Sequence, residues 1–303
     1  MDKSIAKLSK NGPGRKLKKQ GAPDPKDAEG TESSDDEMGD GREVPQVLKV
    51  IDPPKEKTKP LHPHLPQPPA LLLMISPIRT GKSTIINNLL LNSSFFGQDF
   101  FDEVMCISPT IYNDKTSRFL KKAFDCYDEY DDAIIDGLIE KQEAYEDPQD
   151  RPDVALILDD VIGLIRREAK VNHLASRFRH YNIKLLLMSS QNYRKVSPII
   201  RSNCTNMIIG SPFPNMKELG KIAEEIGDQF SGAENFLKIY YLATPNKYDF
   251  LYLDLQSNPP LAYRNFDEVI AVGGQHREEG GAEVGDILGK QAEVNASAPK
   301  QQY

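Results

Sequence analysis

The sequence contains no tryptophan and only three cysteines, and none of its apolar runs is long enough to span a membrane. The cysteines (Cys106, Cys126 and Cys204) are spaced too widely for a zinc site or a disulfide framework. Residues 1–20 also lack the apolar centre of a secretory signal, so a reducing intracellular environment is expected. The net charge of -7 would by itself argue against a nucleic-acid partner.

Charge and proline distinguish the ends of the chain from its middle. Residues 1–20 are basic and residues 22–44 are acidic, and neither block has enough large apolar side chains to bury a core. A proline-rich linker follows, and a segment rich in Gly, Glu and Ala begins near residue 273. We therefore predict a disordered tail and linker over 1–65, one folded domain over 66–271 and a disordered tail over 272–303. Because the two charged blocks nearly cancel, the net charge says little about the surface of the folded domain.

The middle of the chain alternates short apolar runs with segments of helical length. Runs that are apolar on both faces are typical of strands in a parallel sheet covered by helices, and five fit this description: 71–76, 103–108, 154–160, 184–190 and 206–211. Helices are predicted at 84–92, 117–130, 163–181, 216–227 and 231–243, and an added strand at 249–256. The alternation predicts an α/β doubly wound fold with a mostly parallel sheet.

The first run leads through a turn into a helical pattern, which is the context that a P-loop requires. The predicted nucleotide-binding turn comprises Ser76, Pro77, Ile78, Arg79, Thr80, Gly81, Lys82, Ser83 and Thr84. Its backbone N–H groups would surround the phosphates of ATP, with Lys82 at the β- and γ-phosphates and the Ser83 hydroxyl on Mg²⁺. The sequence departs from the P-loop pattern at Ser76, where the pattern has glycine, and serine is one of the milder replacements. The alternative is a chance GKS sequence in a loop.

Two carboxylates follow the run at 154–158. In P-loop proteins the aspartate that serves Mg²⁺ lies at such a strand end, so Asp159 would hold the metal through a water and Asp160 would orient or deprotonate the attacking water. The alternative for these acids is a helix N-cap. Gln191, which follows the next run, is the candidate sensor of the γ-phosphate, or else a simple turn residue. In ATPases with an additional strand, that run lies between the P-loop strand and the acidic strand.

A catalytic arginine finger from a neighbouring subunit would complete such a site. Four arginines flank the run at 184–190, and each could instead be an ordinary solvated side chain: Arg177, Arg179, Arg194 and Arg201. Arg179 is the first candidate and Arg201 the second. The segment Asn192–Lys195, just past Gln191, is a candidate for DNA contact.

Two short motifs imitate those of GTPases. DVIG stands at 160–163 and NKYD at 246–249, and in GTPases the aspartate of the second motif reads guanine. NKYD runs directly into the predicted strand at 249–256, so it is more typical of a hairpin turn than of a base-binding loop. Because both motifs are present, a GTPase switch is kept as an alternative function. A non-catalytic scaffold that binds nucleotide only for assembly is another alternative.

Three blocks of the sequence resemble the DNA-packaging ATPases of poxviruses, giant viruses and virophages, which belong to the FtsK–HerA superfamily. They are SPIRTGKST, LILDD and the long block RHYNIKLLLMSSQNYRKVSPIIRSNC, of which the last is the most specific. The resemblance covers residues 71–210 well. One departure from the broader P-loop pattern is Asp160, where many ATPases carry glutamate.

The resemblance implies a P-loop NTPase fold with an additional strand between the P-loop and acidic strands. It also implies a homo-oligomeric ring that uses ATP and Mg²⁺ to drive double-stranded DNA, without sequence specificity, into a capsid. A capsid or portal vertex would be the partner. The place of action would be the virion assembly site in the host cell, with the virion itself as a second location.

Overall fold

The computed structural model describes residues 61–112, 115–162, 165–166, 169–213 and 215–274. The predicted tails over 1–65 and 272–303 lie outside these residues except at their inner ends. At one inner end Leu65 is buried in the core, and at the other strand β9 (Glu268–Val272) includes residue 272. The folded domain therefore begins before residue 66 and ends after residue 271.

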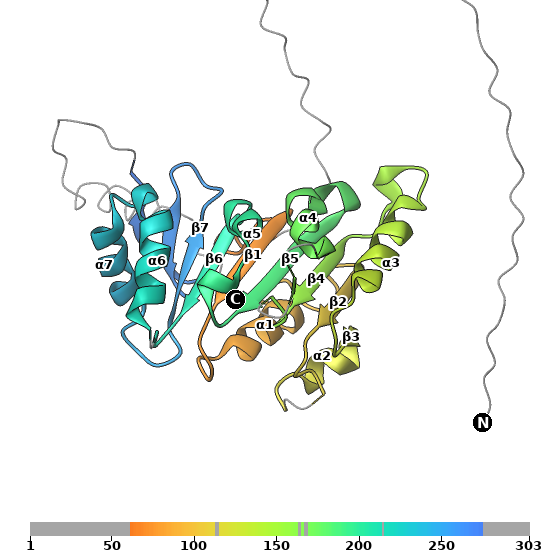
Figure 1. Cartoon of the computed structure of the whole chain (residues 1–303), viewed down its shortest axis with the longest axis horizontal. Helices are drawn as coiled ribbons and strands as arrows, with labels where there is room; N and C mark the ends of the chain where they lie inside the picture. Colours follow the sequence, from red (N-terminus) through yellow and green to blue (C-terminus); the bar gives the residue numbers. More distant parts are fainter. Residues whose placement is uncertain (1–60, 113–114, 163–164, 167–168, 214, 275–303) are drawn as a thin grey trace, which may run out of the picture. The chain divides into compact units, whose positions relative to one another are not determined.

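The described residues form a nine-stranded sheet with the order β3-β2-β4-β5-β1-β6-β7-β8-β9 (Figure 1). The strands before β9 are β1 (Ala70–Ile75), β2 (Glu103–Ile107), β3 (Asp125–Tyr127), β4 (Val154–Leu158), β5 (Ile183–Ser190), β6 (Asn206–Gly210), β7 (Phe250–Asp254) and β8 (Leu261–Arg264). Strands β1 to β6 pair in parallel, and β7, β8 and β9 continue the sheet as antiparallel strands. The predicted doubly wound, mostly parallel sheet is confirmed, and β5 lies between β1 and β4 as the additional strand.

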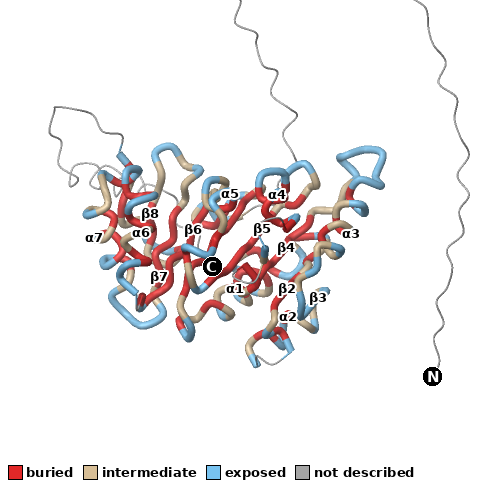
Figure 2. Tube along the Cα trace, in the orientation of Figure 1, coloured by how far each residue is buried: buried red, intermediate tan, exposed pale blue. Residues whose placement is uncertain are grey.

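Helices cover both faces of this sheet (Figure 1). They are α1 (Lys82–Leu91), α2 (Arg118–Ala123), α3 (Asp132–Glu143), α4 (Lys170–Arg177), α5 (Pro198–Ser202), α6 (Met216–Ile226) and α7 (Ala233–Ala243). Successive side chains of β1 alternate between two core clusters: Leu71 and Leu73 pack with residues of α3 to α7, whereas Leu72 and Met74 pack with residues of α1 and α2. All six β1 residues are buried, which explains why the run is apolar on both faces (Figure 2).

Three predicted elements differ from the structure. Of the predicted helix at 163–181, the α-helical part is α4, which begins only at Lys170, and a 3-10 helix follows it at 178–181. The predicted helix at 117–130 ends at Ala123, because residues Asp125–Tyr127 form the short edge strand β3 beside β2. NKYD at 246–249 joins helix α7 to strand β7, so the predicted hairpin turn is wrong. Within the described ranges, no helix is both long enough and apolar enough to cross a membrane.

Candidate nucleotide-binding site

The P-loop connects the end of β1 to the start of α1. Arg79 and Gly81 adopt left-handed backbone conformations, with φ of 65° and 91°. Gly81 directly precedes α1, whose start has neither a capping side chain nor an acidic residue in its first turn. The N–H groups of that first turn have no partners within the helix, so the helix start suits an anion.

Ser76 fits the P-loop without the conformational freedom of glycine. It is fully buried and is not among the described residues with positive φ. Its hydroxyl contacts the Thr80 hydroxyl across the loop, and the Thr80 hydroxyl donates to the Pro77 carbonyl at 2.7 Å. Gly210, at the end of β6, makes room for it: a Cβ atom at position 210 would lie 2.9 Å from the Ser76 Cβ.

The predicted lysine and both predicted acids converge at the carboxyl ends of β1 and β4. The Lys82 ammonium lies 3.8 Å from Asp159 Oδ1 and forms an ion pair with Asp160. Lys82 and Asp159 are buried, and the Asp160 side chain is 23% exposed. Both acids therefore lie beside the P-loop, and their roles toward phosphate and metal stay predictions.

Two serine hydroxyls hold Asp159 in place, and neither was among the predicted site residues. Ser189, on the additional strand β5, donates to Asp159 Oδ1 at 2.6 Å and accepts from the backbone N–H of Asp160 at 2.9 Å. Ser108, which follows β2, donates to Asp159 Oδ2 at 3.3 Å. Burial raises the pKa of the Asp159 carboxyl, while the Lys82 ammonium and the Ser189 hydrogen bond oppose that effect. The sequence signal for both serines is a hydroxyl at the end of an apolar run next to the acidic one.

The structure places Gln191 beside the catalytic candidate Asp160. Gln191 Nε2 donates to Asp160 Oδ2 at 3.2 Å, and the side chain is exposed. An amide in this position can contact both the carboxylate and a water or phosphate oxygen in front of it. Lys82, Asp160 and Gln191 thus come from three neighbouring elements to one point.

The donor atoms at this point fit a Mg²⁺ ion that is bound together with a nucleotide. Ser83 is in the first turn of α1, and its hydroxyl and the Asp159 carboxylate are both hard oxygen donors. Among the described residues there is no group of three or more His, Cys, Asp or Glu side chains that could hold a metal ion alone. Mg²⁺ commonly keeps waters and substrate phosphates as ligands, so a site with few protein ligands suits it better than a preformed cage.

The two candidate finger arginines lie in different surroundings. Arg201 Nη1 pairs with Glu225 at 3.2 Å, and its guanidinium lies 4.9 Å from the centre of the Tyr193 ring. Arg179 is exposed and lies in the turn that precedes β5, at the amino end of that strand. Because the P-loop lies at the carboxyl end of the parallel strand β1, Arg179 and the P-loop are at opposite edges of the sheet. Arg179 is therefore not placed to reach the P-loop of its own chain.

In the segment Asn192–Lys195, the exposed charged side chains are at the carboxyl end. Tyr193 is buried and donates to Glu225 Oε2 at 2.8 Å, so its ring is not a surface for DNA. Arg194 is largely exposed but pairs with Glu218 at 3.4 Å, and Lys195 is exposed. Of the predicted DNA-contacting segment, the side chains of Arg194 and Lys195 remain candidates.

The NKYD sequence does not present its aspartate as a guanine-binding group. Both carboxylate oxygens of Asp249 are engaged: Oδ2 accepts from the backbone N and Nδ2 of Asn246 at 3.0 Å each, and Oδ1 accepts from Asn265 Nδ2 at 3.3 Å. The Asp249 carboxylate thus stabilises the turn of which it is part. This arrangement disfavours the GTPase interpretation.

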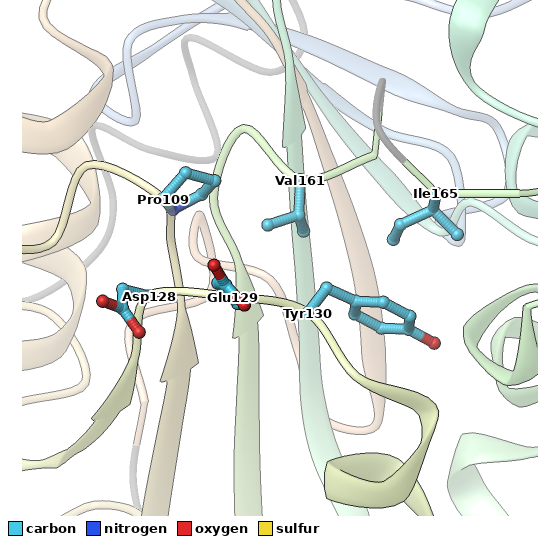
Figure 3. A pocket seen from close by; sticks show the side chains of 6 residues that line it. All are labelled: Pro109, Asp128, Glu129, Tyr130, Val161 and Ile165. Carbon is cyan, nitrogen blue, oxygen red and sulfur yellow. The ribbon is translucent and has the colours of Figure 1, made fainter.

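A pocket of about 480 Å³ is lined by residues that follow β2, β3 and β4 (Figure 3). In the sheet, β2 and β3 lie on the side of β4 away from the P-loop strand β1. Asp128 and Glu129, on the segment after β3, form part of its wall, and Val161, which follows Asp160, forms another part. The described residues that line it include two carboxylates and no cation. This pocket is therefore a poor place for a triphosphate, and the P-loop remains the candidate site for the nucleotide.

No family model matches the chain, and no curated protein matches it. Among solved structures it is similar to B204, the DNA-packaging ATPase from Sulfolobus Turreted Icosahedral Virus. The identity is 18%, with 70% of this chain and 100% of that chain covered, at a TM-score of 0.47. The genome packaging NTPase B204 from Sulfolobus turreted icosahedral virus 2 in complex with AMPPCP has 16% identity, with 69% and 98% covered, and a TM-score of 0.44.

A third similar structure is EssC (ATPases 2 and 3) from Geobacillus thermodenitrificans. The identity is 16%, with 77% of this chain and 46% of that chain covered, at a TM-score of 0.42. Likenesses of this degree assign no activity to the chain, so the function depends on its own residues.

Proposed function

We propose that this chain is an ATP-hydrolysing motor that moves double-stranded DNA into a viral capsid. The observation that carries the catalytic part is the convergence of Lys82, Asp160 and Gln191 in front of the P-loop, with Asp159 held behind them by Ser108 and Ser189. A positive charge for the phosphates, a carboxylate for the attacking water and an amide for the γ-phosphate are the parts that phosphoryl transfer to water requires.

Each residue has a proposed task in hydrolysis. Lys82 exchanges its ion pair with Asp160 for the β- and γ-phosphate oxygens, which leaves Asp160 able to orient the attacking water or take its proton. Gln191 contacts Asp160 and would report the presence of the γ-phosphate to β5. Ser83 and Asp159 would hold Mg²⁺, which neutralises charge on the transferring phosphoryl group.

The DNA-packaging part of the proposal rests on the sequence resemblance over residues 71–210. A motor that moves any sequence must hold the phosphate backbone rather than read bases. Arg194 and Lys195 are the candidate residues for contact with the DNA backbone. A homo-oligomeric ring at the capsid or portal vertex, acting where virions assemble, would allow Arg179 of one subunit to serve the P-loop of the next.

Steady-state nucleotide hydrolysis with and without double-stranded DNA tests this proposal on the full chain. The proposal predicts Mg²⁺-dependent ATP turnover that DNA of unrelated sequences stimulates alike, with a stimulation that falls as salt rises. A preference for GTP that disappears in Asp249→Asn would support the switch instead. Nucleotide binding without any turnover would support the non-catalytic scaffold.

A further inference from the structure

The turn Asn246–Asp249 lies at the same edge of the sheet as the P-loop. Strand β6 runs parallel to β1, and β7 runs antiparallel to β6, with Phe250 opposite Gly210. The start of β7 therefore lies beside the carboxyl ends of β1 and β6. Tyr248 reaches the P-loop itself: its Cδ1 would be 3.6 Å from a Cβ atom placed on Gly81.

The turn lies on the side of the P-loop toward which the ribose and base of a bound nucleotide would project. The acids and Gln191 come from β4 and β5, which lie on one side of β1, so the γ-phosphate belongs on that side. A triphosphate that runs along the P-loop then carries its ribose and base away from β4, toward β6 and β7. Tyr248 is an exposed aromatic side chain at that place, whereas Tyr240 and Phe250 beside Gly210 are buried.

The turn holds Tyr248 in an exposed and strained conformation. Its φ is 74°, which is rare for a bulky residue, and the residue is 54% exposed. Asn246 and Asp249 brace the turn on either side of Tyr248 through three hydrogen bonds, and Asn265 ties Asp249 to the loop after β8. Strain that the surroundings maintain is a reason to look for a function.

The ring already contacts a cation. The Lys247 ammonium lies 4.7 Å from the centre of the Tyr248 ring, and the lysine is exposed. A flexible, exposed lysine can leave an aromatic face when a flat ligand arrives. Exposed aromatic faces beside phosphate sites suit nucleobases because every base has a π-face.

We infer that Tyr248 is the stacking surface for the base of the nucleoside triphosphate bound at the P-loop. This inference rests on the proposed function and adds the base-binding residue. Asp249 Oδ2 is bonded to Asn246 within the turn and Oδ1 is bonded to Asn265 after β8, so this carboxylate is not directed at a guanine edge. Tyr248 therefore selects for stacking area, favouring purine over pyrimidine nucleotides and discriminating little between ATP and GTP.

The test compares the binding of ATP and of inorganic tripolyphosphate to the full chain by calorimetry. Tyr248→Ala should weaken ATP binding by roughly tenfold, the effect of losing one base–aromatic stack, and leave tripolyphosphate binding unchanged. Tyr248→Phe should bind ATP as the wild type does. Tyr248→Gly relieves the positive φ, and it should lose ATP affinity as the alanine variant does. Tyr241→Ala, which removes a similarly exposed tyrosine from α7, is the matched control.

The outcomes separate this inference from the proposed function. Equal loss of ATP and tripolyphosphate affinity in Tyr248→Ala would show that the ring supports the P-loop and not the base, which overturns the inference alone. Unchanged ATP affinity in Tyr248→Ala and Tyr248→Gly would do the same. If the wild-type chain binds neither ligand, the proposed function fails.

Discussion

The side chain of Ser76 fills the space that a side chain at position 210 would need. Ser76 opens the P-loop and Gly210 ends the neighbouring strand β6, and a Cβ atom on Gly210 would collide with both the Cβ and the hydroxyl of Ser76. The serine that departs from the P-loop pattern is thus matched by a glycine on the next strand. The pair explains how the loop tolerates a side chain at a position where the pattern has none.

Gly210→Ala should destabilise the domain by about 1–3 kcal/mol, because the added methyl overpacks a buried site. The double variant Ser76→Gly/Gly210→Ala should recover most of the lost stability, since it moves the side chain from the P-loop to the neighbouring strand. The measurement is the free energy of unfolding from denaturant titration. Gly220→Ala is the control: nothing lies within 4 Å of a Cβ there, and alanine favours helix α6. Strictly additive effects of the two substitutions would contradict the account of the pair.

Ser189→Ala should lower ATP hydrolysis by roughly 10–100-fold while the chain stays folded. The hydroxyl orients Asp159 and also accepts the backbone N–H of Asp160, and removing such a supporting group typically has an effect of this size at a metal site. The Mg²⁺ concentration for half-maximal activity should rise as well. Ser202→Ala removes an exposed hydroxyl that donates to the Ile199 carbonyl within α5, and it should leave hydrolysis unchanged. Wild-type Mg²⁺ dependence in Ser189→Ala would separate Ser189 from the metal site.

The two candidate arginines should behave differently. Arg201→Ala should lower the free energy of unfolding by about 1–2 kcal/mol, because it removes the pair with Glu225 and the stacking on Tyr193. Its turnover per folded subunit should remain near that of the wild type. Arg179→Ala removes an exposed side chain and should change unfolding by less than about 0.5 kcal/mol, yet turnover should fall sharply.

Mixing subunits tests whether Arg179 acts on a neighbour. An Arg179→Ala subunit keeps its own P-loop, and a Lys82→Ala subunit keeps Arg179, so mixed oligomers should regain part of the turnover that each variant lacks alone. Lys141→Ala, which breaks an exposed ion pair with Glu103, is a neutral partner for comparison. Absence of recovery on mixing would contradict the assignment in trans.

Much of the fold could be predicted because buried parallel strands have a strong local signal. β1, β4 and β5 are apolar on both faces, and the polar residues that end them mark the edge where the site lies. β3 escaped prediction because Asp125–Tyr127 has only three residues and continues a helical pattern. Its pairing with β2 overrides that local preference.

The candidate site could be predicted from the sequence only where its residues belong to recognisable short segments. Lys82, Asp159, Asp160 and Gln191 each follow a recognisable strand, and the sheet order brings them together. The contacts of Ser76 with Gly210 and of Gly81 with Tyr248 join residues that are distant in sequence. No local pattern encodes these contacts, so they required the structure.

The central claim is that Lys82 and Asp160 form a hydrolytic centre, and single-turnover ATP hydrolysis in Mg²⁺ tests it most directly. The account predicts that Asp160→Asn binds ATP as tightly as the wild type but cleaves it at least about 10²-fold more slowly, because the attacking water loses its base. Lys82→Ala should lose both binding and cleavage. Cleavage by Asp160→Asn at the wild-type rate, or full activity of Lys82→Ala, would contradict the account.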